Sequence, residues 1–450
     1  MSVGPGLRAR LPEGLLTAIG GPRGVRAARR PARTGVPPAL VLLLVLPLGV
    51  AALRQASCAA DGWAGRAALW RQCASPLMTA VGVDGPQGLL AYLTGRVGGD
   101  LPLVPGFVTS ALTTLAPGSG LQQQRGVLVL WAVAAAVLLA GLVVAVATVR
   151  DTPRADAVAL ALSPVLAVSV LLSVQLVPVA LAVGGLWAWQ RRRPELAGAL
   201  LGVAVLGGRP ALLVLLAVAL CPPVGVADAV RRLLRAAGTA LLLVVGPVAA
   251  VDLGLVLRPL SAWWGGGADA GSPWFVPELA RHPLGSVPVA VVSLLGMLLA
   301  GGLVAVLATR RPRPVAADLA LLGVVVVLLT GASFRPADAV WLVPFVALAG
   351  IRWRDHLVWA GAEAAHAVAL YTWLDAATDP AKGLPAGWYA TALSLRLLAV
   401  GRLAWVVWAR ASWEVPPPAG TLERLPSERP VDRSRVVVGD DAYPPVTEGP

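Results

Sequence analysis

Charged residues are scarce in this sequence. Asp, Glu, Lys and Arg together make up 14% of its 450 residues, against about 25% in a typical soluble domain, whereas 57% of the residues are hydrophobic. Lysine is nearly absent, because Lys382 is the only one among 37 basic residues. This composition excludes an ordinary soluble domain and predicts a polytopic membrane protein.

Cysteine and histidine are also scarce, with three residues of each. The cysteines form no CxxC pair and the histidines form no cluster, although protein metal sites usually show such patterns. The sequence therefore predicts neither a metal site nor a cofactor. Cys221 lies at a predicted membrane boundary and is expected to be an inert, packed thiol.

The basic residues outnumber the acidic ones and give a formal net charge of +13. Such a balance can indicate a nucleic-acid partner, but no basic helix or aromatic-interleaved patch accompanies it. Most arginines instead lie in short clusters between apolar runs, the pattern that sets the orientation of membrane spans. We therefore predict membrane lipids as partners and no nucleic acid.

Apolar segments recur along most of the chain, and a membrane span needs about twenty mainly apolar residues. They lie at about 38–53, 126–149, 155–172, 174–190, 196–220, 236–257, 287–309, 315–332, 340–351, 356–374 and 388–408. The predicted fold class is all-α, a polytopic transmembrane helical domain of about 10 to 12 spans between residues 38 and 410.

The arginine clusters between these segments predict the topology, because loops rich in arginine stay in the cytoplasm. If all the clusters face the cytoplasm, each interval between them contains an even number of crossings. Residues 155–190 then form a hairpin of two tight helices. Residues 196–220 form either two half-depth helices or one exception to the rule, and the helix breaker "GGRP" at 207–210 favours the two half-depth helices.

Both termini are predicted to be cytoplasmic in a multi-pass plasma-membrane protein. Residues 1–37 are rich in Pro, Gly and Arg, and residues 411–450 are rich in Pro and charged side chains, so both are predicted to be disordered tails. A basic start followed by a short apolar run is also typical of a secretory signal. This alternative stays open beside an uncleaved first span.

The same topology places three larger segments outside the cytoplasm, at about 54–125, 258–286 and 375–387. The first is the largest and contains Cys58 and Cys73. Disulfides persist in that compartment, but a bridge also requires close Cα atoms, which the sequence does not show. A Cys58–Cys73 disulfide and two separate thiols both remain open.

A family resemblance rests on the order and character of the segments from Cys58 to Leu374. It is carried by "ADAVALALSPVLAVSVLLSVQLVPVALAVGGLWAWQ" and the residues that follow it, by "GSPWF", and by "LLTGASFRPADAVWLVPFVALAG". These segments resemble the actinobacterial branch of glycosyltransferase family 87. The resemblance implies a GT-C fold and transfer of a mannose-type sugar from a polyprenyl-phosphate donor to an envelope glycolipid or glycan.

Several polar signatures of that family are replaced in this chain. The family's first-loop cysteine precedes Tyr-Ser-Asp, whereas Cys73 precedes Ala-Ser-Pro. "SVQ" at 173–175 stands in place of Asn-Trp-Asp, and "GGRP" in place of Ala-Lys-x-Tyr-Pro. Residues 330–338 resemble Asn-Lys-x-x-Ser-Pro-Gln-Tyr without its lysine, and "DLPLVPG" at 100–106 resembles Glu-Tyr-Pro-x-x-x-Gly. A catalytically inactive relative that binds lipid or a protein partner is therefore the principal alternative.

Transfer from a lipid-phosphate sugar needs a carboxylate base and groups that stabilise the departing phosphate. By the resemblance, Asp100 is the predicted base and Asp84 the second choice; the alternative for each is a solvated loop acid. The predicted phosphate ligands on the outer face, or else interfacial side chains, are Arg71, Arg96, Arg258 and Arg335. The predicted substrate platform, or else membrane anchor, is Trp263, Trp264 and Trp274.

A few charges lie inside the predicted spans. Glu363 and His366 share one helix face, and Arg402 lies on the last span at a similar estimated depth. Because charges within a bilayer usually face protein and pair, we predict a structural Glu363–Arg402 ion pair. The alternative is a proton path through Glu363 and His366, which would make the protein a lipid or solute transporter.

Overall fold

The computed structural model describes residues 38–82, 88–93, 101–149, 154–222, 228–310, 314–376 and 383–413. Within these ranges every regular element is a helix and no strand occurs. The predicted all-α class is therefore confirmed. The two predicted tails, apart from 411–413 at the end of the last helix, lie outside the described residues.

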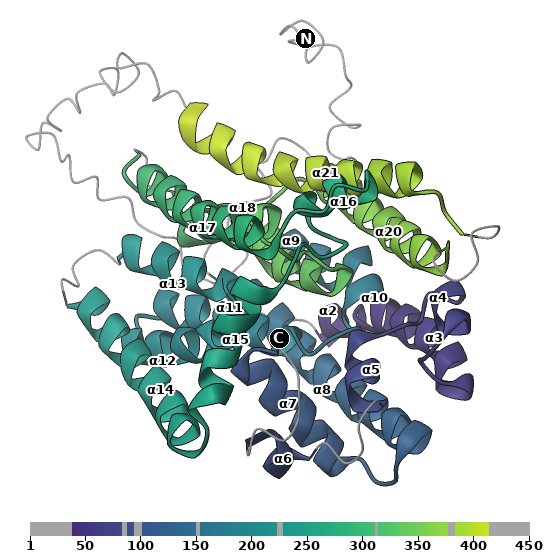
Figure 1. The fold of residues 1–450 in the computed structure, drawn as a ribbon. Coiled ribbons are helices and arrows are strands. Elements are labelled where there is room, and N and C mark those ends of the chain that lie inside the picture. Colours follow the sequence, from purple (N-terminus) through teal and green to yellow (C-terminus); the bar gives the residue numbers. More distant parts are fainter. Residues whose placement is uncertain are drawn as a thin grey trace, which may run out of the picture.

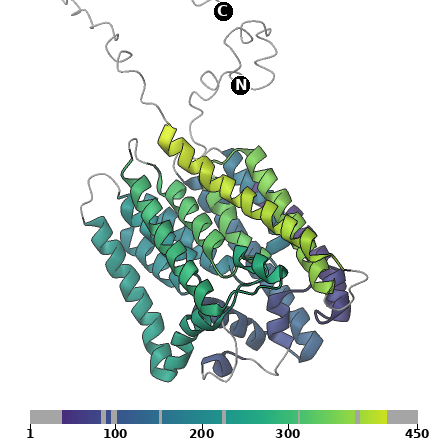
Figure 2. The same ribbon diagram turned by 45° about the horizontal axis from the view of Figure 1, so that its top comes forward.

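Among the described residues, five helical segments are long and apolar enough to cross a membrane: α2 and α3 together (Pro38–Leu42 and Val45–Asp61), α8 (Gly120–Thr148), α14 (Ala229–Val251), α17 (Ser286–Ala308) and α21 (Ala386–Trp413). At 1.5 Å per residue, 23 residues span about 35 Å, more than the roughly 30 Å hydrocarbon core. Large apolar side chains on these helices point outward, including Leu242, Leu298 and Leu398. Together they indicate a membrane-embedded bundle, whose long helices run in roughly the same direction in Figure 2.

The segment at 194–220 is broken near 207–210, where the sequence predicts a break between two half-depth helices. Helix α12 (Pro194–Val205) ends before "GGRP", and α13 (Pro210–Leu220) begins at its proline. Proline has no backbone N–H to give to the preceding turn but fits the first position of a helix. Two shorter helices therefore take the place of one long span.

The region at 154–190 is broken further than predicted. It contains α9 (Arg154–Ala161), α10 (Pro164–Ser169) and α11 (Leu176–Gln190), rather than a hairpin of two continuous helices. Pro164 again starts a new helix, with Ser163 in extended conformation before it. These breaks shorten several apolar helices in the part of the chain that the structure describes, so helix length alone does not count the crossings.

Helix α3 continues to Asp61, beyond the predicted start of the first loop near residue 54. The described part of the loop contains four short helices, α4 (Arg66–Trp70), α5 (Pro76–Gly82), α6 (Leu89–Leu93) and α7 (Leu103–Leu115). Cys58 and Cys73 are joined by a disulfide, with their Cα atoms 5.9 Å apart. Arg54 donates to the carbonyl oxygens of Gln72 (2.9 Å) and Val168 (2.9 Å), which ties the start of the loop to α10.

The second half of the described chain forms the opposite part of the bundle. It contains α15 (Leu253–Gly265), η2 (Pro273–Phe275), α16 (Val276–Leu279), α18 (Ala316–Thr330), η3 (Pro336–Trp341), α19 (Leu342–Leu348) and α20 (Trp353–Ala376). Figure 1 shows α20 and α21 packed side by side in the upper right of the view, with α12, α13 and α14 grouped at the left. Two loops from this half, after α15 and after α18, face the broken helices of the first half.

Candidate functional site

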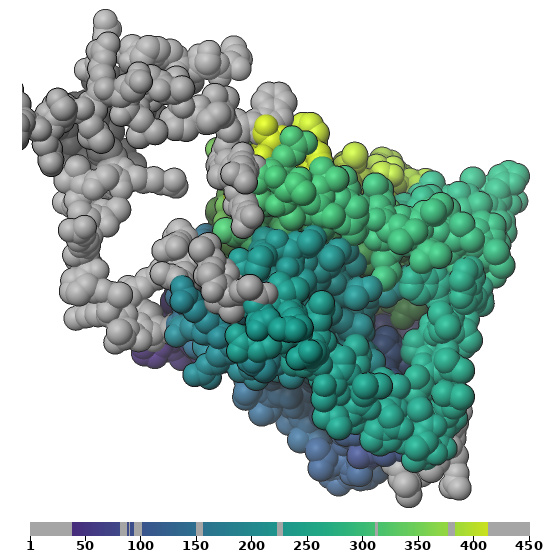
Figure 3. Space-filling view, turned by 90° about the vertical axis from the view of Figure 1, so that its left-hand side faces the viewer, coloured from purple at the N-terminus to yellow at the C-terminus, as the bar shows by residue number. Residues whose placement is uncertain are grey.

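A cavity of about 810 Å³ lies where the start of α7, the α12–α13 break, α15 and the segment after α18 meet. Most of its wall is apolar, but a smaller polar set faces it: Gln175, Arg209, Asp269, Ser333, Arg335 and Asp338. The space-filling surface is hollowed between teal and green segments, with blue and purple atoms visible deeper inside (Figure 3). An apolar cavity with a few convergent polar groups is the usual form of a ligand site.

One side of the polar wall is a pair of loops joined by hydrogen bonds. Asp269 forms an ion pair with Arg335, and its Oδ2 also accepts a hydrogen bond from the Ser333 hydroxyl (3.0 Å). The Asp269 backbone N–H donates to the Ala332 carbonyl (2.8 Å). The loop after α15 and the loop after α18 therefore present their side chains as one surface.

Asp338 lies one turn after Arg335, at the start of η3. Its Oδ2 accepts a hydrogen bond from the Arg335 backbone N–H (2.9 Å), so the carboxylate caps the helix that Pro336 begins. Burial raises the pKa of the Asp338 carboxyl, and the hydrogen bond from the Arg335 backbone works in the opposite direction. A carboxyl with a raised pKa at a cavity wall is a candidate acid or base.

The guanidinium of Arg209 also borders the cavity, close to the start of the loop after α18. This residue directly precedes α13, and its Cζ lies 4.8 Å from the centre of the Trp263 ring, a cation–π arrangement. Asp269 pairs with Arg335. Arg209 forms no ion pair within the described ranges, and the carboxylate that acts on it electrostatically is Asp338. A cation that borders the cavity outside an ion pair suits an anionic group of a ligand.

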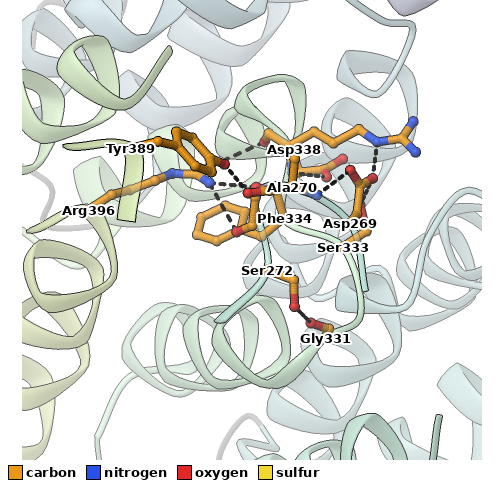
Figure 4. Close-up of polar contacts among 11 residues, drawn as sticks. Asp269, Ala270, Ser272, Gly331, Ser333, Phe334, Asp338, Tyr389 and Arg396 are labelled. Atoms are coloured by element: carbon orange, nitrogen blue, oxygen red, sulfur yellow. Dashed lines mark hydrogen bonds and ion pairs between the residues drawn. The ribbon is translucent and has the colours of Figure 1, made fainter. Parts of the chain in front are cut away.

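The back of this site is held by a buried arginine on α21. Arg396 is fully buried and forms a two-pronged ion pair with Glu363 of α20, with Nε–Oε2 at 2.9 Å and Nη2–Oε1 at 2.7 Å. Its other N–H groups donate to carbonyl oxygens of both cavity loops, as Figure 4 shows for Phe334. The cavity wall is thus continuous with the α20–α21 pair.

The predicted Glu363–Arg402 pair is wrong. Arg402 donates from Nε (3.0 Å) and Nη2 (2.8 Å) to Asp355, which is buried near the start of α20. Because α20 and α21 are antiparallel, a later residue on one helix meets an earlier residue on the other. Glu363 therefore reaches Arg396, and Asp355 reaches Arg402; estimating depth from span ends missed this register.

The predicted site residues divide into three groups. Asp84, Arg96 and Asp100 lie outside the described residues. Arg335 and Trp263 line the cavity. The remaining candidates lie elsewhere: Arg71 is ion-paired with Asp61, Arg258 and Trp264 are on α15 but not in the lining, and Trp274 donates through Nε1 to the Thr330 carbonyl (2.9 Å).

Three residues that face the cavity are not among the site residues predicted from the sequence: Arg209, Asp269 and Asp338. The segments that carry the family resemblance contained part of the signal, because Gln175, "GGRP" and residues 330–338 were each matched to a family signature. All three contribute residues to the cavity lining, as do Leu101, Pro102 and Leu103 of "DLPLVPG". Asp269 lies in no quoted signature, so only the fold brings it to Arg335.

The segment around Cys73, "LWRQCASPLM" at 69–78, has a structural role in the described chain. The Ser75 hydroxyl and the Leu77 N–H both donate to the Leu172 carbonyl (3.2 Å each), and Tyr371 donates to the carbonyl of Ala74 (2.8 Å). None of these residues lines the cavity. The segment anchors the first loop to the bundle.

Comparison of the chain with protein-family models, with curated proteins and with solved structures finds no match. Within the described ranges, no group of three His, Cys, Asp or Glu side chains is placed to hold a metal ion. The functional hypothesis therefore depends on the cavity and on the residues that face it.

Proposed function

We propose that this protein is a membrane glycosyltransferase of the GT-C type, resembling family 87, with the cavity as its substrate site. The observation that supports this proposal is that four segments distant from one another in the chain border one cavity. Two of them, at 100–106 and 330–338, resemble family signatures, and the other two, "SVQ" and "GGRP", stand where the family has signatures of its own. The donor would be a polyprenyl-phosphate-linked, mannose-type sugar. The acceptor would be an envelope glycolipid or glycan on the outer face of the plasma membrane.

The lining suits such an amphipathic donor. Apolar side chains of α15, including Val256 and Leu260, border the cavity next to the polar loops, and they would hold the start of the prenyl chain. Arg209 would receive the phosphate because it borders the cavity and forms no ion pair in the described chain, and Asp338 is the carboxylate that acts on it electrostatically. Trp263 stacks against Arg209 and would keep its guanidinium fixed.

The transfer itself needs one base. The acceptor hydroxyl oxygen attacks the anomeric carbon while the bond from that carbon to the phosphate oxygen breaks. The hydroxyl proton passes to a carboxylate, and the departing polyprenyl phosphate keeps the bonding electron pair beside Arg209. Asp338 is the better of the two carboxylates for this role, because Asp269 is already neutralised by Arg335.

The test is transfer by purified protein from polyprenyl-phosphate mannose to an envelope lipid extract. Asp338→Asn is expected to lower the rate by about 10² to 10⁴, while Asp228→Asn, an exposed acid that pairs with Arg231, leaves it unchanged. Asp100→Asn belongs in the same series. A full rate in Asp338→Asn with a large loss in Asp100→Asn would move the base to Asp100.

A second candidate function is lipid binding without transfer. It is favoured by the first-loop segment Ala74, Ser75 and Pro76, which stands where the family has a motif that contains an acid. In this segment the Ser75 hydroxyl donates to the Leu172 carbonyl. Polyprenyl-phosphate binding together with no transfer from any donor would support this candidate. The third alternative, transport, would require Glu363 to exchange protons although both its oxygens contact Arg396.

A further inference from the structure

We propose that Arg396 is a positioning residue for the cavity: it fixes the two loops that present Asp269, Arg335 and Asp338, without itself being among the lining residues. The inference rests on the proposed function only where ligand binding is concerned. Its structural part concerns the order of the loops, which can be measured whatever the ligand is.

The guanidinium of Arg396 makes as many polar contacts as it has N–H groups. Two go to Glu363, as an ion pair through Nε and Nη2. The others go to backbone carbonyls: Nη1 donates to Phe334 and to Gly271 (3.4 Å), and Nη2 donates to Arg335 (3.2 Å). The Phe334 ring also lies under the guanidinium, with its centre 3.7 Å from Cζ.

These carbonyls sit beside the side chains that face the cavity. Gly271 is two residues after Asp269, and Phe334 stands between Ser333 and Arg335. A second residue of α21 contacts the loop after α15, because the Tyr389 hydroxyl donates to the Ala270 carbonyl (Figure 4). Displacement of either loop by a fraction of an ångström would therefore move the charged groups of the wall.

Arginine is required at this position for a geometric reason. Lysine would keep the positive charge beside Glu363, but it has three donors on one nitrogen and cannot serve a carboxylate and three carbonyls at separate places. Glu363 in turn compensates a guanidinium that is wholly buried. The Glu363–Arg396 pair therefore joins two helices and also holds the two loops that face the cavity.

The neighbouring Asp355–Arg402 pair supplies a control on the same helices, with the difference that Arg402 is half-exposed and Arg396 is wholly buried. It joins the same two helices, α20 and α21, and both hydrogen bonds from Arg402 go to Asp355 rather than to a loop. Arg396→Lys and Arg402→Lys each weaken one link between the helices. Of these two variants, we expect only Arg396→Lys to release the cavity loops.

The experiment places a fluorine label at Gly267→Cys in a Cys221→Ala background. Gly267 lines the cavity, and a Cβ there would meet nothing within 4 Å, so the label is tolerated. The fluorine resonance of the full-length protein in lipid nanodiscs reports the environment and motion of the loop. Polyprenyl phosphate binding is measured in parallel on the unlabelled variants.

We expect Arg396→Lys to shift or broaden the fluorine resonance and to weaken polyprenyl phosphate binding by about tenfold to a hundredfold. Arg402→Lys should change neither. Tyr389→Phe removes the bond to the Ala270 carbonyl and the contact of the hydroxyl with His366, but no charge. It should change both the resonance and the binding in the same direction by a smaller amount, and it remains informative if Arg396→Lys does not fold.

Unchanged resonances in both Arg396→Lys and Tyr389→Phe would overturn the inference. Equal changes in Arg396→Lys and Arg402→Lys would do so as well, because they would reduce Arg396 to a link between helices. If the resonance responds as expected while even the unmodified protein binds no polyprenyl phosphate, the loop-positioning role stands and the proposed function fails.

Discussion

Gly271 illustrates how closely the two cavity loops approach each other. A Cβ atom at this residue would lie 1.9 Å from the Phe334 carbonyl oxygen, far inside van der Waals contact, and the obstacle is backbone. That same carbonyl accepts a hydrogen bond from Arg396. A single added methyl group would therefore separate the loops and disturb the buried guanidinium.

We accordingly expect Gly271→Ala to destabilise the protein by about 1 to 3 kcal/mol, the usual cost of overpacking. The control is Gly267→Ala in the same loop, where a Cβ meets nothing within 4 Å. Thermal unfolding in detergent compares the two variants with the unmodified protein. Equal midpoints for both variants would mean that the loops can part without cost.

Asp338 gives a prediction about pH. Burial raises the pKa of its carboxyl, and only the deprotonated form can accept the acceptor's proton. The transfer rate should therefore rise as pH increases through this raised pKa and fall as pH decreases below it. Initial rates between about pH 5 and pH 9 test this; Asp338→Asn should lose the rise, and an unchanged profile in that variant would assign the titration to another group.

The sequence predicts those parts of the site that local patterns determine, and it does not predict those that depend on packing between distant helices and loops. Apolar runs and prolines were sufficient to indicate helices and the α12–α13 break, because both act locally. Glu363 was correctly expected to pair, since a charge within a span needs a partner. Its partner depends on the antiparallel register of α20 and α21, which no local pattern specifies, and Asp269 reaches Arg335 only through packing of two distant loops.

Helices α12 and α14 approach each other closely at Gly198, which leads to a prediction about stability. A Cβ at Gly198 of α12 would lie 2.2 Å from the Leu233 carbonyl oxygen of α14, so these helices approach as closely as small residues allow. Gly198→Val should push α14 away and lower stability by about 1 to 3 kcal/mol. Gly238→Val, on α14 where a Cβ meets nothing within 4 Å, serves as control in unfolding measurements.

The predicted topology determines the side of the membrane on which the polar wall of the cavity lies. Its polar wall comes from Asp269, Ser333, Arg335 and Asp338, on segments that the arginine clusters assign to the outer side. The arginine cluster that begins at Arg310, between α17 and α18, would then lie at the opposite end of those helices. A sugar donor presented at the outer face could reach this wall, whereas the reverse orientation would open it toward the cytoplasm.

The orientation can be measured across α17. Gly267 precedes this helix on the predicted outer side, and Thr309 follows it beside an arginine cluster; a helix of 23 residues separates its ends by about 35 Å. In a Cys221→Ala background, an impermeant maleimide should label Gly267→Cys in intact cells and Thr309→Cys only after permeabilisation, because arginine-rich ends stay inside. Cys58 and Cys73 do not interfere, since they are joined in a disulfide. The opposite labelling would place the cavity wall on the cytoplasmic side and would remove the outer face as the site of transfer, while the contacts of Arg396 would be unaffected.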